Sequence, residues 1–186
     1  MKQLRLVGLL ISLGVSTVAL ARSTQPMAGQ GTNPPPKELI DSTQAALVDQ
    51  IKCQDRPQVA RAINAMLAHK LIRYVANENG IYAFAPTVRL TFLGMHIVHI
   101  SGFDRDGPPF RGVPGTRMVG TAPETFLQID VAGGQEELRS RALVAGMVEA
   151  VPHAHKRGFQ VSAKGTYLAP TPVWTSNIEC VDYRAY

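Results

Sequence analysis

The dipeptide Asn79-Gly80 constrains the fold of this chain more than any other short feature. It separates two runs rich in β-forming residues, 71–76 and 81–85. Asn-Gly between such runs is a strong signal for a β-hairpin with a two-residue turn, because both residues tolerate positive φ. A hairpin joins antiparallel neighbours. The sequence therefore predicts an antiparallel or mixed sheet rather than the alternating strand–helix order of a doubly wound sheet.

Two helices are predicted before the hairpin and one after it. Residues 37–53 carry one apolar helical face, and a second helix is expected to start at Asp55, a favourable N-cap residue. A third helix is expected to open at residues 135–137 and to end at Pro152, with its apolar run 142–148 well buried. The second helix has the clearest period, with apolar side chains at Val59, Ile63, Met66, Leu67 and Leu71.

Further β-rich segments follow the hairpin. Residues 87–103 form a long run that Gly94 interrupts, which indicates either a bulge or a break between two strands. Residues 124–131, 159–167 and 173–181 are also expected to be strands. The order of elements predicts an α+β fold, with an antiparallel or mixed sheet of about five to six strands and three helices packed mainly on one face.

The amino-terminal segment has the pattern of a signal peptide. Two basic residues precede an apolar run at 6–20, and Ala-Leu-Ala ends at Ala21 as a small-residue cleavage site. The run is shorter than the roughly 20 apolar residues that span a membrane. We therefore expect a signal peptide at 1–21, cleavage near Ala21, and a periplasmic or extracellular protein without a stable membrane span. Residues 22–36 are rich in Pro and Gly and predict a disordered tether, and 37–186 predict a single domain.

The chain has two cysteines, Cys53 and Cys180. In an exported protein an even number of cysteines favours disulfide formation, and two cysteines allow one intramolecular pairing. The sequence therefore predicts a bond between the end of the first helix and the last strand. A bonded sulfur is not a thiolate, which disfavours a cysteine nucleophile.

Net charge and motifs narrow the classes of ligand. The formal charge of +5 falls to +3 without Lys2 and Arg5 of the leader, well short of the basic surface of a nucleic-acid-binding protein. The sequence contains no phosphate-binding loop, dinucleotide-binding fingerprint or serine nucleophile elbow. No cofactor and no nucleic acid are predicted, and the absence of a catalytic motif favours a protein that is not an enzyme.

Two pairs of histidines are candidate metal ligands. His96 and His99 are three residues apart, so a regular strand directs them to opposite faces. His153 and His155 could share one side of an extended segment, but two imidazoles alone leave a zinc site incomplete. No metal site is predicted.

Residues 102–123 form a long segment rich in Gly and Pro, without periodicity. Loops of this length are uncommon in compact domains and are often functional, although a poorly ordered surface loop fits the same pattern. Apolar side chains among arginines are typical of a surface that binds another protein. The predicted partner-binding residues are Phe103, Asp104, Arg105, Asp106, Phe110, Arg111, Arg117 and Met118.

These features favour a small exported protein that binds a partner protein, such as an inhibitor, an immunity factor or an accessory of an envelope machine. The first alternative is an envelope hydrolase that uses carboxylates, among Asp104, Asp106 and Glu124, or His153 and His155. The second alternative is a binder of small molecules or lipids.

Overall fold

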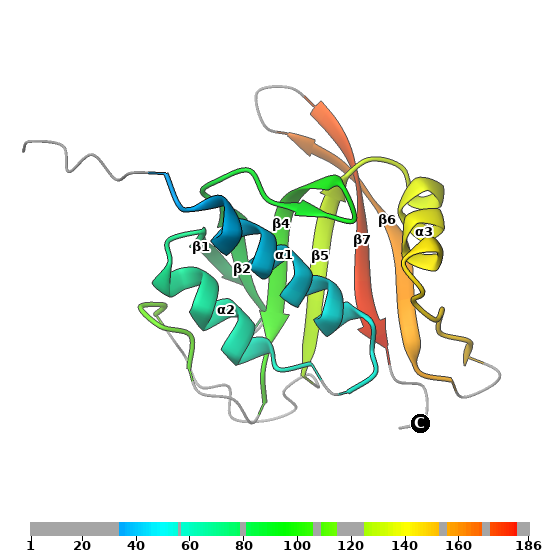
Figure 1. Ribbon diagram of the computed structural model, residues 1–186, viewed down its shortest axis with the longest axis horizontal. Helices are drawn as coiled ribbons and strands as arrows, with labels where there is room; N and C mark the ends of the chain where they lie inside the picture. The colour runs from blue at the N-terminus through cyan, green and yellow to red at the C-terminus, as the bar shows by residue number, and fades with distance from the viewer. Residues whose placement is uncertain are drawn as a thin grey trace, which may run out of the picture. The chain divides into compact units, whose positions relative to one another are not determined.

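The computed structural model describes residues 34–55, 57–78, 81–105, 109–114, 125–152, 156–168 and 172–181. Within these ranges the chain is α+β, with three helices and an antiparallel sheet of seven strands (Figure 1). In chain order, the elements are α1 (Lys37–Ile51), α2 (Val59–Ala68), β1 (Ile72–Glu78), β2 (Ile81–Pro86), β3 (Thr91–Phe92), β4 (Met95–Phe103), β5 (Phe126–Ala132), α3 (Gln135–Val144), β6 (Gly158–Leu168) and β7 (Pro172–Val181).

The strands lie in the order β1-β2-β4-β5-β7-β6, and the short β3 pairs with β4. The β1–β2 hairpin predicted from Asn79-Gly80 is confirmed, because Glu78 and Ile81 are paired at its end. The sheet has seven strands rather than five to six. The additional strand arises because Leu93 and Gly94 both have positive φ and break the run around Gly94 into β3 and β4.

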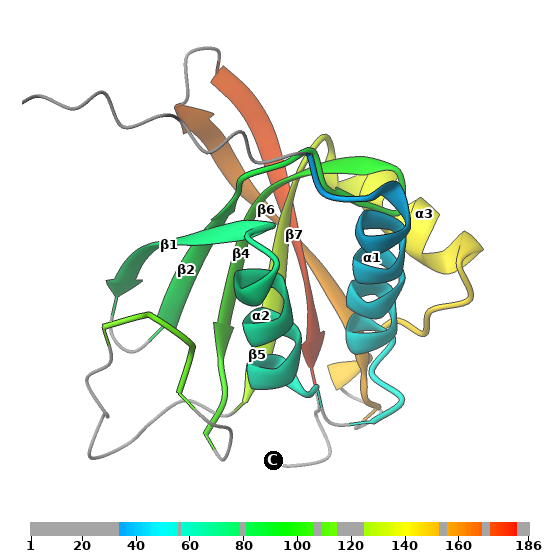
Figure 2. The same ribbon diagram turned by 60° about the vertical axis from the view of Figure 1, so that its left-hand side comes forward.

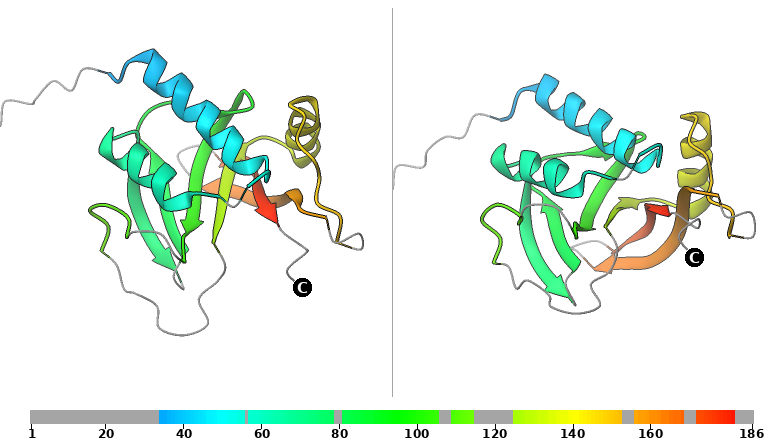
Figure 3. Two further views of the ribbon diagram at one scale, coloured as in Figure 1. Left: turned by 60° about the horizontal axis from the view of Figure 1, so that its bottom comes forward. Right: turned by 90° about the horizontal axis from the view of Figure 1, so that it is seen from below.

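Helices α1 and α2 lie across one face of the sheet, and α3 lies beside β6 (Figures 1, 2 and 3). All three helices contribute side chains to the same apolar core. Leu47 and Ile51 come from α1, and Leu138 comes from α3. The strands supply the other side of this core in alternation, as period-two patterning requires. Its fully buried strand residues include Phe84, Ile97, Ile100, Leu127, Ile129, Val131, Phe159 and Ile178.

The predicted disulfide is confirmed. Cys53 follows α1 and is bonded to Cys180 of β7, with a Cα–Cα distance of 5.4 Å. The bond spans 127 residues of sequence, and chain entropy alone assigns such a loop a stabilisation of about 4–5 kcal/mol. It anchors α1 to the sheet.

The start of α2 differs from the prediction. The helix begins at Val59 with Gln58 as its N-cap residue, so Asp55 does not cap it. A carboxylate oxygen of Asp104 accepts a hydrogen bond of 2.9 Å from the backbone N–H of Ala60. A free backbone N–H group in the first turn of α2 is therefore satisfied by a side chain that follows β4. Because this side chain is distant in sequence, local helix propensity does not reveal it.

The predicted burial of the run 142–148 is wrong for most of its residues. The helix ends at Val144, and Gly146 takes a positive φ in the turn that follows. Leu143, Val144 and Val148 are 50%, 88% and 60% exposed. The physical reason is geometric, because a helix of this length presents only one narrow stripe to the sheet. In α3 that stripe is Leu138 and Ala142.

The predicted signal peptide and most of the predicted tether lie outside the described residues. No helix among the described residues is long and apolar enough to cross a membrane.

Candidate functional site

The face of the sheet turned away from the helices carries a group of polar and charged side chains. We call this surface the open face. Strand pairing places Asp130 of β5 opposite His99 on one side and opposite Asn177 on the other. Alternation along the strands defines the central residues of the open face as His99, Ser101, Gln128, Asp130, Lys164, Asn177 and Glu179.

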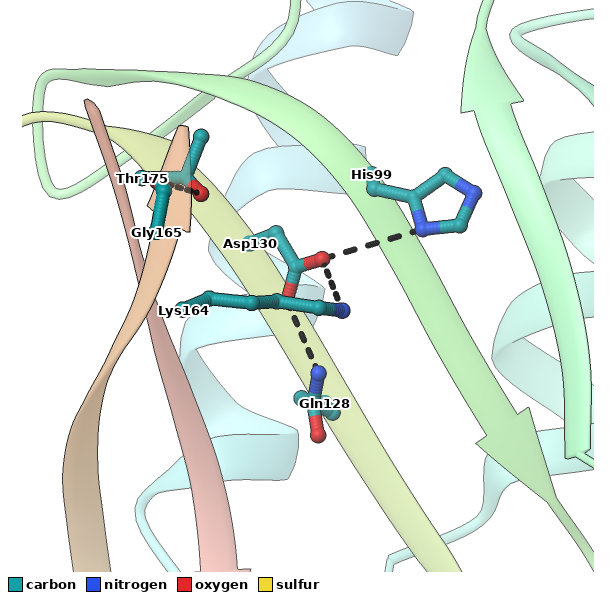
Figure 4. A network of polar contacts seen from close by, with 6 residues as sticks. All are labelled: His99, Gln128, Asp130, Lys164, Gly165 and Thr175. Carbon is teal, nitrogen blue, oxygen red and sulfur yellow. Dashed lines mark hydrogen bonds and ion pairs between the residues drawn. The ribbon is translucent and has the colours of Figure 1, made fainter. Parts of the chain in front are cut away.

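Asp130 lies at the centre of a polar network (Figure 4). It is 3% exposed. Lys164 Nζ donates to Asp130 Oδ2 over 2.6 Å, and Gln128 Nε2 donates to Asp130 Oδ1 over 2.8 Å. Nδ1 of His99 lies 3.7 Å from Asp130 Oδ2. A carboxylate is thus buried among three groups that favour its charged form.

Two β-bulges direct side chains toward Asp130. In β4 the register shifts between Ile97 and His99, so Val98 is the extra residue and His99 faces Asp130. In β6 the shift falls between Ala163 and Gly165, which makes Lys164 the extra residue. Such bulges re-aim side chains and often lie near functional sites.

The bulge in β6 is held by its neighbour strand and by its own backbone. Gly165 takes a φ of +101°, and its carbonyl accepts a hydrogen bond of 3.0 Å from the hydroxyl of Thr175 (Figure 4). A side chain at this φ would be strained, so glycine suits the position. The local conformation that presents Lys164 to Asp130 is therefore fixed by specific residues.

The bulge in β4 also corrects the prediction for the histidine pair. Met95 and Ile97 point into the core, so His96 lies on the opposite side of the strand. The extra residue at Val98 then reverses the alternation, and His99 lies on the same side as His96. No three His, Cys, Asp or Glu side chains of the described residues are grouped in a way that would hold a metal ion.

The two carboxyl groups of the open face have opposite electrostatic environments. Burial by itself raises the pKa of Asp130, but its contacts with His99, Lys164 and Gln128 outweigh burial and hold that pKa below the ordinary value of 3.8. Burial, followed by repulsion from Asp130, raises the pKa of Glu179 above 4.5. Asp130 is thus held ionised, whereas Glu179 binds its proton more tightly than a free glutamate.

The network forms part of the wall of a cavity of about 520 Å³ on the open face. Its polar lining consists of His99, Ser101, Gln128, Lys164 and Asn177, and its apolar lining consists of Val75, Ala76, Ile81, Ala83 and Phe126. A largely apolar cavity with a few convergent polar groups is typical of small-molecule sites.

Asn177 supplies a polar atom without a protein partner. Its Oδ1 atom is buried and accepts no hydrogen bond from the described part of the chain. Buried acceptors in folded proteins are almost always satisfied, so this exception calls for an explanation that the described donors of the chain do not give. Asn177 lies directly opposite Asp130 on the neighbouring strand.

The structure distributes the predicted partner-binding residues over different environments. Phe110 is 7% exposed and packs edge-on against Tyr82 and Phe84, with ring centroids 5.0 and 5.4 Å apart. Its ring belongs to the core and is not an anchor on the surface. Asp104 is used at the start of α2 and lies 3.4 Å from the hydroxyl of Thr125.

The structure does not bring the remaining predicted residues together into one surface that can be described. Arg105 and Arg111 are exposed and Phe103 is partly exposed. Asp106, Arg117 and Met118 lie outside the described residues, as do Glu124, His153 and His155 of the hydrolase alternative. The partner surface therefore stays a prediction.

Sequence reasoning missed the central residues of the open face. The alternation in residues 126–132 was a usable signal, because it places Gln128 and Asp130 on the side opposite Leu127, Ile129 and Val131. The contributions of His99 and Lys164 depend on bulges, of which Gly165 is a weak sign for the one at Lys164 and nothing marks the one at Val98. No protein-family model, curated protein or solved structure matches this chain, so its function must be argued from this geometry.

Proposed function

We propose that this chain is a small exported binding protein and that its ligand lies in the cavity of the open face. The ligand is a small molecule with an apolar body and at least one hydroxyl or N–H group. The observation that carries the proposal is the orphaned oxygen of Asn177 in the cavity wall, directly opposite the buried carboxylate of Asp130.

The cost of burying charge supports a functional role for this network. Removing the carboxylate of Asp130 from water costs several kcal/mol, and its contacts with Lys164, Gln128 and His99 offset this only with good geometry. The core on the helix side already gives the sheet its apolar anchor. A buried carboxylate with a lowered pKa beside a cavity is more typical of a functional site than of a folding requirement.

The two parts of the cavity fit two parts of one molecule. Val75, Ile81 and Phe126 offer apolar surface, and burying an apolar group there gains about 25 cal/mol per Å². In the proposed complex the ligand donates a hydrogen bond to Asn177 Oδ1, which has no donor among the described residues, and this bond orients the ligand. The site therefore suits a small amphipathic molecule.

Binding is proposed rather than catalysis. Ser101 lines the same cavity as His99, but no hydrogen bond joins its hydroxyl to that ring among the described residues. A serine nucleophile requires such a contact with its base. The disulfide and the amino-terminal signal-peptide pattern support export, since disulfides persist in oxidising compartments.

Binding of another protein is the second candidate function. It rests on the exposed Leu143 and Val144 at the end of α3, on Val148 after it, and on the arginines of the 102–123 segment. Large exposed apolar side chains near one another are typical of interaction surfaces. The burial of Phe110 removes one of the expected anchors, so the open face carries the stronger argument.

The test uses octan-1-ol as a neutral probe with a hydroxyl donor. Backbone amide shifts of the full chain are measured by NMR during titration, and we expect the largest changes at Ser101, Gln128 and Asn177. Ala83→Phe fills the cavity and should abolish these changes, whereas Ala145→Phe, exposed after α3, should leave them intact. Asn177→Ala should weaken binding by up to about tenfold through loss of one hydrogen bond.

Circular dichroism and thermal unfolding show whether each variant keeps its fold. The proposal is overturned if octan-1-ol shifts no amide of the open face, or if Ala83→Phe binds it as well as the wild-type protein does.

A further inference from the structure

A second cavity, of about 740 Å³, lies beside the first on the open face. Its charged and titratable lining consists of Arg73, Arg89 and His96, and none of its lining residues is Asp or Glu. A concave surface with two guanidinium groups and an imidazole attracts anions.

The register of the strands shows that the two cavities adjoin. Ala83 lines the first cavity and Ala85 lines the second, and these residues are successive on the open face of β2. Val98 and His99 are consecutive in β4 and line the second and the first cavity, respectively. Arg73 of β1 is paired with Ala85, which places it at the same end of the sheet.

The arginines of the second cavity are not neutralised by protein carboxylates. Arg73 and Arg89 form no ion pair with any residue that the structure describes, and both are exposed. Two arginines of α3 behave differently. Arg139 is paired with Glu136 and Glu149, and Arg141 is paired with Glu137.

The segment that carries Arg89 is held on both sides. Before it, the backbone N–H of Thr87 donates to the carbonyl of Leu71 over 2.9 Å. After it, the amide and hydroxyl of Thr91 donate to Gln44 Oε1 over 2.6 and 2.8 Å. Leu90 is fully buried. The backbone of Arg89 is therefore positioned before any ligand arrives, which lowers the entropic cost of binding.

The ring of His96 is oriented by the same segment. Its Nδ1 atom lies 3.2 Å from the carbonyl oxygen of Leu90. A carbonyl only accepts hydrogen bonds, so Nδ1 carries the proton and Nε2 remains available for another contact. In the neutral ring Nε2 is therefore an acceptor, and only in the protonated ring does Nε2–H donate a hydrogen bond to an anion.

We propose that the second cavity binds the anionic group, a carboxylate or a phosphate, of the amphipathic molecule whose apolar body lies in the first cavity. The inference rests on the proposed function and specifies the class of its ligand. Arg73 and Arg89 provide forked donors that match the oxygens of either group, and His96 adds a third donor when its ring is protonated. The ligand is thus an amphipathic acid or phosphate monoester that also carries the hydroxyl or N–H group of the proposed function.

The test compares four probes on the full chain by isothermal titration calorimetry: octan-1-ol, octanoate, octyl phosphate and inorganic phosphate. Because their chains match, differences among the first three report the head group. We expect the better of octanoate and octyl phosphate to bind at least about tenfold more tightly than octan-1-ol, with the advantage falling as salt is raised. Inorganic phosphate alone should bind weakly because it lacks the apolar part.

Variants separate the anion site from general charge effects. Arg73→Gln/Arg89→Gln should remove most of the preference for the charged probes and leave octan-1-ol binding unchanged. Arg61→Gln alters an exposed arginine of α2, on the helix side, and should change neither. Equal affinity for octan-1-ol and both charged probes overturns this inference and leaves the proposed function intact, as does an unchanged preference in the double variant. Failure of octan-1-ol to shift any amide of the open face overturns both.

Discussion

On β5, Ile129 and Val131 are completely buried on the helix side, whereas the alternating residues Gln128 and Asp130 form a hydrogen-bonded pair on the open face. The same contrast recurs on β7, where Ile178 is completely buried and Asn177 lies in a cavity wall. The two faces share one backbone, so the difference lies in what each face requires of its side chains.

The helix side requires apolar volume and close packing, which many combinations of Leu, Ile, Val and Phe supply. The open face requires particular partners, because a buried carboxylate is tolerated only with donors in place. Fold stability is therefore concentrated on one face. The other face carries features that stability alone does not explain, namely an orphaned acceptor and unpaired arginines.

The largest expected effect is a difference in unfolding free energy between substitutions at two neighbouring residues of β7. Ile178→Ala leaves a hole in the core and should cost about 2–5 kcal/mol of unfolding free energy. Asn177→Ala removes a buried acceptor without a partner and should change stability by no more than about 0.5 kcal/mol, or raise it. Urea unfolding of both variants measures the contrast. A loss at Asn177 as large as that at Ile178 would show that the open face is structural.

The helix-side half of this comparison was largely predictable. Alternation in residues 126–132 and the dipeptide Asn79-Gly80 report local backbone preferences, and the strands and the hairpin follow from them. The disulfide followed from the number of cysteines and the expected compartment. In each case the signal lies within a few residues or in a count, so one sequence suffices.

The open-face half was not predictable, because its geometry depends on irregularities. The extra residues Val98 and Lys164 shift the register by one and change which side chains meet Asp130. Gly165, next to Lys164, is only a weak sign of the second bulge, and no residue type marks the first bulge at Val98. The apolar residues Leu143 and Val144 mislead for a related reason, because hydrophobicity without a packing partner does not imply burial.

The next effect concerns the start of α2, where a contact distant in sequence replaces the local cap. Asp104→Ala removes the acceptor for the N–H of Ala60 and should lower stability by about 1 kcal/mol. The matched control is Asp55→Ala, at the residue that sequence alone favours as the cap, and it should have almost no effect. Thermal unfolding of both variants measures the difference. Equal losses would contradict the assignment of Asp104 as the cap.

The smallest expected effect on stability depends on pH. It distinguishes Asp130 from Glu179, because the pKa values of these two carboxyl groups are shifted in opposite directions. The pKa of Asp130 is lowered, so its contribution to stability is present above its unfolded value of 3.8 and is lost as pH falls through the still lower folded pKa. The pKa of Glu179 is raised, so its relative stabilisation is complete below 4.5 and is lost as pH rises through the folded pKa. At neutral pH the ionised Glu179 therefore opposes folding.

Glu179→Gln removes this opposition and should stabilise the protein at pH 7 by a fraction of a kcal/mol, because the carboxyl group is only partly buried. At pH 4, where Glu179 is already protonated in the folded state, variant and wild-type stabilities should converge. Glu38→Gln, in the first turn of α1, serves as the control. There the helix dipole favours a carboxylate, so this substitution should slightly destabilise the protein at pH 7. Equal stabilisation by Glu179→Gln at pH 4 and pH 7 would mean that packing, rather than repulsion from Asp130 and burial, governs this position.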